Sequence, residues 1–194
     1  MFKCASMRPP LCAIDIDTAR RLRYIHGAMN ARRVLIGVFI LGVVHSIYYF
    51  PQLPRHMASH FNALGGPDSW SSRLAFYATY LGGLAFTTIM FLAIPYFLRR
   101  VPHKWVNLPN RDYWLAPSRV DESLARFGTA LYRFGAVTNA FMIFAFQCTV
   151  IANLRPSLAF PNEVMVGGVV FYFAFTAIWV VTLLLSFRKT HSQA

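Results

Sequence analysis

The residues best suited to chemistry gather in one short segment, between positions 50 and 72. Two histidines, His56 and His60, precede the carboxylate of Asp68, and such side chains can bind a metal ion or transfer protons. Their spacing matches no standard zinc-binding pattern. We favour a structural interpretation, in which His60 and Asp68 hold a folded loop by hydrogen bonds. In the alternative, these two side chains are the metal ligands of an active centre.

Polar side chains also interrupt the apolar runs of the chain, at His45, Arg133, Asn139 and Gln147. Inside a membrane such residues normally face neighbouring helices and can mark a pathway. Arg133 is close enough to one end of its run to extend its guanidinium to the membrane surface. His45 could bind the metal of a pigment, but a hydrogen bond to another helix is the simpler expectation. We therefore expect no cofactor, with a pigment or a metal as the alternative.

Four long apolar runs must position these residues. The chain has 194 residues, of which 56% are hydrophobic and 13% charged, whereas a soluble domain is roughly 45–50% apolar. About 20 apolar residues cross a hydrocarbon core of about 30 Å as a helix, which satisfies its own backbone hydrogen bonds. The runs lie at 34–50, 74–98, 129–152 and 165–187. They predict an all-α polytopic membrane protein, with a four-transmembrane-helix bundle over residues 34–187.

Basic residues alternate between the segments that flank these runs. Seven lie in residues 1–33 and six between the second and third runs, whereas the other two connections hold only Arg55, Arg73 and Arg155. Basic segments stay in the cytoplasm, so we expect both termini, including the tail 188–194, on that side of a bacterial inner membrane. The same distribution accounts for the net charge of +12, and no nucleic acid partner is expected.

Residues 1–33 form a basic N-terminal segment with two open interpretations. Asp17 and Thr18 could begin a helix from Ala19 to about Arg33, with apolar residues near one face. Such a helix could lie in the membrane interface, with its arginines at the headgroups. The alternative is a basic tail without fixed structure.

The segment after the first run carries a recognisable motif. Gly65 and Gly66 permit positive φ, and Pro67 and Asp68 suit a compact turn. The segment resembles a bacterial membrane domain of unknown function found in SdpI-type toxin-immunity proteins, in the pattern L-P, a gap, and H-F-N-A-x-G-x-P-D-x-W. The matching residues are Leu53, Pro54, His60, Phe61, Asn62, Ala63, Gly65, Pro67, Asp68 and Trp70.

A second motif lies between the second and third runs. It is similar to the family segment N-x-P-N-x-x-Y-W-L, and its residues are Asn107, Pro109, Asn110, Asp112, Tyr113, Trp114 and Leu115. The resemblance implies a membrane domain, and in the longer SdpI-type proteins it implies immunity to a secreted peptide toxin with sequestration of a repressor. Those proteins have further spans that this sequence lacks, so we expect the immunity role to transfer poorly. The residue types of this segment predict either a tight loop on the membrane surface or a docking surface for a partner.

These observations favour a non-catalytic function. The acidic residues lie outside the apolar runs, and no glycine-rich phosphate loop is present. We predict a small integral membrane protein that binds a protein partner, as an accessory subunit of a membrane complex or as an immunity-like factor. Its partners would be the lipid bilayer and another membrane protein or further copies of itself. A transporter or sensor of a peptide or small molecule is the first alternative, and a metal-dependent membrane enzyme is the second.

Reporter fusions test the predicted topology. A periplasmic reporter fused near His60 should be active, and a cytoplasmic reporter should be active near Asn110, because basic residues are concentrated around the second site and sparse around the first. The reverse pattern of activities would overturn the argument from charge.

Overall fold

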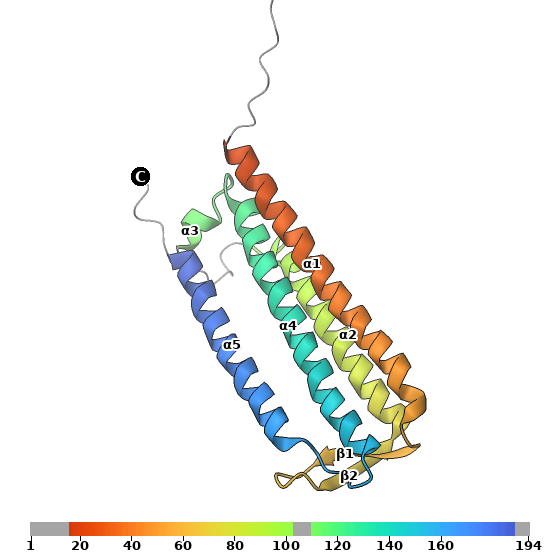
Figure 1. The fold of residues 1–194 in the computed structure, drawn as a ribbon. Helices are drawn as coiled ribbons and strands as arrows, with labels where there is room; N and C mark the ends of the chain where they lie inside the picture. Colours follow the sequence, from red (N-terminus) through yellow and green to blue (C-terminus); the bar gives the residue numbers. More distant parts are fainter. Residues whose placement is uncertain (1–15, 103–109, 189–194) are drawn as a thin grey trace, which may run out of the picture.

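The computed structural model describes residues 16–102 and 110–188. Four long helices run side by side, and a short β-hairpin lies across one end of the bundle (Figure 1). The long helices are α1 (Ile16–Tyr49), α2 (Arg73–Leu98), α4 (Val120–Leu154) and α5 (Asn162–Arg188). The shorter elements are η1 (Phe50–Gln52), β1 (His56–Phe61), β2 (Pro67–Ser72) and α3 (Arg111–Trp114). We call the end with β1 and β2 the hairpin end and the other the basic end.

Each long helix is long and apolar enough to cross a membrane. The predicted fold class, an all-α multi-pass membrane protein, is therefore confirmed. The helices extend beyond the apolar runs from which we predicted them. The last turn of α5 and the first turn of α1 lie at the same end of the bundle (Figure 1).

The first and third helices differ from the predicted spans in length. The helix expected from Ala19 to about Arg33 is present, but it continues into the first span without a break, as one helix of 34 residues. A separate helix lying in the membrane interface would need a break near Arg33. Similarly, α4 begins at Val120 rather than 129, because no proline follows Pro117 before the apolar run.

The loop expected to be a compact turn is an antiparallel β-hairpin. Met57 pairs with Ser71 and Ala58 with Trp70. In the turn, the Asn62 side-chain oxygen accepts hydrogen bonds from two backbone N–H groups, those of Leu64 (2.9 Å) and Gly66 (3.1 Å). Gly65 has φ +83°, a conformation that favours glycine. Neither six-residue strand, HMASHF or PDSWSS, alternates apolar and polar residues strictly, so the sequence does not indicate them.

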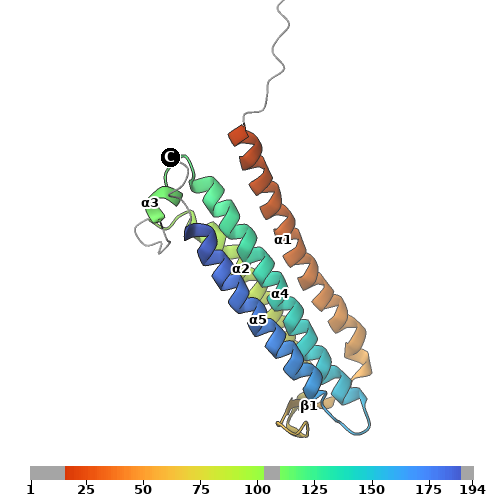
Figure 2. The same cartoon turned by 60° about the vertical axis from the view of Figure 1, so that its left-hand side comes forward.

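Helix α4 occupies the centre of the bundle. Figure 2 shows α1 on one side of it and α5 on the other. Toward the hairpin end, Val150 of α4 packs in a cluster with Tyr77, Tyr80 and Leu84 of α2. Toward the basic end, Leu131 and Ala136 of α4 pack with Leu35 and Phe91. Helix α5 contacts α4 mainly through stacked aromatic rings, such as Phe134 on Trp179 with centroids 4.4 Å apart. The rest of α5 exposes apolar side chains, as lipid allows.

Glycines set the closest helix approaches. A methyl group added at Gly135 of α4 would lie 2.6 Å from the ring of Phe91 on α2, and one at Gly83 of α2 would lie 2.7 Å from Met142 on α4. One added at Gly82, the neighbour of Gly83, would meet nothing within 4 Å. Small residues at interfaces let membrane helices pack closely. Of this pair, only Gly83 therefore lies at the interface.

Alanine substitutions separate these positions. Gly135→Ala should lower the thermal stability of the detergent-purified protein, because overpacking costs on the order of 1–3 kcal/mol. Gly82→Ala provides the matched control and should leave stability unchanged or raised, since alanine has the higher helix propensity. Equal melting temperatures for the two variants would contradict the close packing of α2 on α4.

Candidate functional site

The hairpin is fixed to the bundle by one side chain of α4. The Asn153 carboxamide accepts a hydrogen bond from the Ala58 N–H (2.8 Å) and donates one to the Ala58 carbonyl (2.8 Å). Ala58 has no exposed surface, so these backbone groups have no access to water. Because a strand offers alternate backbone groups to each side, Asn153 acts on β1 as a neighbouring strand would. The hairpin is thereby a supported platform.

A second clamp holds the chain that enters the hairpin. The Arg73 guanidinium donates hydrogen bonds to the carbonyls of Phe50 (2.9 Å) and Leu53 (2.8 Å), and it lies 4.4 Å from the centroid of the Phe50 ring. Leu53 and Met57 are buried beneath the hairpin, against Tyr77 and Tyr80. Ser72 caps α2 by accepting a hydrogen bond from the Ala75 N–H. The hairpin and the start of α2 therefore form one rigid unit.

A polar cluster lies inside the bundle, close to this unit. His45 Nε2 donates to Gln147 Oε1 (2.7 Å), and the Tyr80 hydroxyl donates to His45 Nδ1 (3.3 Å). Gln147 Nε2 in turn donates to the Tyr49 hydroxyl (3.3 Å). Both ring nitrogens of His45 therefore have a hydrogen-bond partner, one as donor and the other as acceptor. His45 thus joins α1 to α2 and α4 by hydrogen bonds. The sequence had led us to expect a hydrogen bond from His45 to another helix.

The exposed side of the hairpin carries four chemically active side chains. His56 stacks on Trp70, with centroids 5.7 Å apart and planes 8° from parallel. His60 Nδ1 donates a hydrogen bond to the Asp68 carboxylate and so joins β1 to β2. The side chains of His60 and Asp68 are 70% and 41% exposed. An exposed pair of this kind contributes little to stability. We call His56, His60, Asp68 and Trp70 the exposed face of the hairpin.

This pair alone makes an incomplete metal site. Within residues 16–102 and 110–188, no group of three or more His, Cys, Asp or Glu side chains is placed to hold a metal ion. A protein site for zinc usually offers at least three ligands. His60 and Asp68 would supply two.

The hairpin motif also holds the first turn of α5. The Asn162 side chain donates to the Ala63 carbonyl (2.9 Å), and the Phe160 N–H donates to the Gly65 carbonyl (3.2 Å). The ring of Phe61 stacks on that of Phe160, with centroids 4.8 Å apart. Leu64, at the tip of the turn, is 95% exposed.

The second motif holds the last turn of α5 at the basic end. Asn110, in a left-handed conformation with φ 54°, donates from Nδ2 to the carbonyl of Arg188 (2.9 Å). Trp114 Nε1 donates to the carbonyl of Phe187 (2.8 Å), and the two rings meet edge to face. The last carbonyls of a helix lack partners within it. This motif therefore supplies a cap made by side chains from distant sequence.

The other predicted residues fall outside these contacts. Asn139 is fully buried and donates to Thr88 Oγ1 (2.8 Å), so it joins α4 to α2. Arg133 is exposed on α4 and faces away from the bundle interior. Tyr113 lies under the Arg119 guanidinium, and Asp112 lies in the first turn of α3. Pro54 is exposed before β1, and Pro67 begins β2. Asn107 and Pro109 lie outside the described residues.

Sequence reasoning missed three residues that assemble this site: Asn153, Arg73 and Asn162. Each lies next to an apolar run, where a polar residue is expected at the end of a membrane span and indicates no specific contact. Asn153 follows its partner Ala58 by 95 positions. No local pattern in one sequence joins residues so far apart.

Comparison with known proteins identifies part of this region. Residues 37–82 match the model of a family described as Domain of unknown function (DUF1648). The match runs from the middle of α1 through the hairpin to the first turns of α2. No curated protein and no solved structure matches the chain.

Loss of the Asn153 clamp should loosen the hairpin. Asn153→Ala leaves the N–H and carbonyl of Ala58 buried without partners, at about 1–3 kcal/mol for each group. Hydrogen exchange followed by mass spectrometry should show faster exchange in a peptide that covers 56–72. Ser69→Ala, on the exposed part of β2, is the control and should exchange like the parent protein. Unchanged exchange in Asn153→Ala would contradict the clamp.

Proposed function

We propose that this protein is a non-catalytic membrane protein that binds a peptide or protein partner with the exposed face of its hairpin. The observation that carries the proposal is the contrast between the two sides of one short hairpin. Asn153, Leu53 and Met57 fix it from the bundle side, whereas its other side presents two imidazoles, a carboxylate and an indole.

The chemistry of the exposed face supports binding. Trp70 is 46% exposed, although burial of an indole is strongly favourable. Tryptophan is enriched among the residues that dominate binding energy at protein interfaces. A rigid surface also loses little conformational entropy when a partner binds. The exposed face is therefore suited to recognition, and it carries no complete set of catalytic groups.

The open edge of the sheet offers a mode of binding. Asn153 covers the backbone of β1, and in the described part of the chain β2 has a strand neighbour on one side only. An extended segment of a partner could pair with β2, as in other complexes formed by strand addition. The side chains of Asp68 and Trp70, both on β2, would then contact it directly.

The proposed setting is the inner membrane of a bacterium, with the hairpin outside the cytoplasm. The distribution of basic residues supports this orientation. A partner on that side would be a larger membrane complex, for which this chain is an accessory subunit, or a secreted peptide, for which it is an immunity-like factor.

A sensor is the second candidate, favoured by the polar cluster at His45. Leu53, just before β1, and Met57 of β1 pack on Tyr80, and Tyr80 is hydrogen-bonded to His45. Movement of the hairpin would therefore reach the centre of the bundle. In this form, a ligand should raise the melting temperature of the protein, and His60→Ala or Asp68→Ala should remove that shift.

Cross-linking in intact membranes tests the main proposal. A photoreactive amino acid at Trp70 should give an adduct with a defined polypeptide, identified by mass spectrometry. The same residue at Phe171, which is 70% exposed on α5, is the control and should react with lipid. Native purification in mild detergent should retain that polypeptide.

Substitution then measures the contribution of the exposed face. The double variant His60→Ala/Trp70→Ala should weaken retention at least about tenfold, since a binding hot spot contributes about 2 kcal/mol or more. Ser69→Ala should retain the partner like the parent protein. Equal retention by the double variant, or an adduct at Phe171 alone, would refute the proposal.

A further inference from the structure

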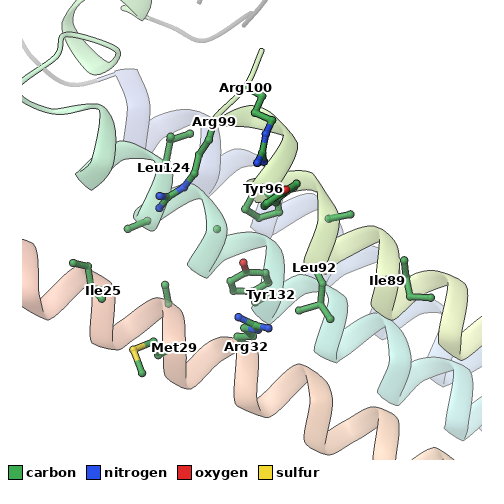
Figure 3. A pocket seen from close by; sticks show the side chains of 15 residues that line it. Ile25, Met29, Arg32, Ile89, Leu92, Tyr96, Arg99, Arg100, Leu124 and Tyr132 are labelled. Carbon is green, nitrogen blue, oxygen red and sulfur yellow. The ribbon is translucent and has the colours of Figure 1, made fainter. Parts of the chain in front are cut away.

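A groove opens between α1, α2 and α4 at the basic end, away from the hairpin (Figure 3). It has a volume of about 950 Å³, at the upper end of the range for small-molecule sites, roughly 300–1,000 Å³. Most of the wall is apolar, with Ile25 and Met29 from α1, Ile89 and Leu92 from α2, and Leu124 from α4. Such a wall fits hydrocarbon.

Three arginines line the same groove. Arg32 reaches in from α1, and Arg99 and Arg100 come from the end of α2 (Figure 3). The Arg100 guanidinium lies over the Tyr96 ring, 3.8 Å from its centroid. Stacking on an aromatic ring leaves the edge N–H groups of a guanidinium free to bind an anion. The groove therefore has a cationic side within an apolar wall.

No acidic group neutralises these arginines within the described residues. The nearest carboxylates along α4 are Asp121 and Glu122, before Leu124, and neither lines the groove. The His60–Asp68 ion pair lies at the hairpin end, far from the groove. The groove also contains the hydroxyls of Tyr96 and Tyr132, which have no hydrogen-bond partner among the described residues. The site thus offers donors and positive charge to a ligand.

The arrangement along the helix axis identifies the class of ligand. Ile89 precedes Arg99 by ten residues on α2, which corresponds to about 15 Å along a helix. On α2, the apolar wall therefore extends from Arg99 and Arg100 toward the middle of the membrane. On α1, Arg32 lies deeper than Ile25 and Met29, because α1 begins at the basic end. A molecule that is anionic at one end and hydrocarbon at the other fits the α2 side of the groove, and Arg32 adds a donor from α1. Guanidinium groups bind phosphate oxygens in bidentate geometry.

We propose that this groove binds one anionic phospholipid, with its phosphate between Arg32 and Arg99 and an acyl chain along Ile89 and Leu92. Basic pockets between membrane helices are known to bind such headgroups. The lipid would fill the space between α1 and α2 and connect the two helices at this end. The inference is independent of the partner proposed for the hairpin.

Native mass spectrometry of the full-length protein tests the site. After delipidation in detergent, dioleoyl phosphatidylglycerol should bind at one site, and dioleoyl phosphatidylcholine should bind at least tenfold more weakly. Arg32→Gln and Arg99→Gln should each weaken phosphatidylglycerol binding by about tenfold, or about 1.4 kcal/mol. Arg133→Gln removes an equal charge from an exposed position outside the groove and should bind like the parent protein.

Three results would overturn the inference. Equal weakening by Arg133→Gln would show that general surface charge attracts the lipid. Equal affinity for the two lipids would show that the arginines do not select an anion. Inorganic phosphate gives the third comparison, because it shares the headgroup chemistry without acyl chains. If it raises the melting temperature as much as phosphatidylglycerol does, the apolar wall is not part of the site.

Discussion

Lipid removes the hydrophobic driving force between helices, because an apolar side chain is equally well solvated by acyl chains and by a neighbouring helix. The position of a helix then depends on close packing and on polar contacts. Helix α5 shows this constraint directly. Its apolar surface faces outward along most of its length, while contacts with residues from distant sequence hold its two ends. Asn162 and Phe160 attach the first turn to the hairpin, and Asn110 and Trp114 cap the last turn.

The same constraint explains the place of the hairpin. A short two-stranded sheet is marginal in water by itself, and its open edges carry unpaired backbone groups. Asn153 closes one edge, and the buried side chains of Leu53 and Met57 join it to the helical core. The residues left over, on the exposed face, contribute little to stability. That division gives the hairpin a structural side and a side available for binding.

The two motifs recognised in the sequence therefore share a structural purpose, whatever their partners. Asn62, Gly65 and Phe61 shape a turn that receives α5, and Trp114 with Asn110 receives its other end. Their residue types are those that the geometry requires: an asparagine or glycine at positive φ, and an indole N–H for a helix carbonyl. His60, Asp68 and Trp70 belong to the first motif but make none of these contacts with α5. They are the residues to which we assign the proposed binding.

The sequence by itself determined the membrane class, the four helices and the two segments that matter, because length and hydropathy of a span are local properties. It also indicated a polar partner for His45 on another helix. It did not determine the hairpin, whose six-residue strands lack a clear period, or the clamp between Asn153 and Ala58, which joins residues 95 positions apart. Nor could it reveal the groove lined by Arg32 and Arg99, which depends on how α1, α2 and α4 diverge. Only the tertiary structure decided these features, because each depends on the relative placement of separate helices.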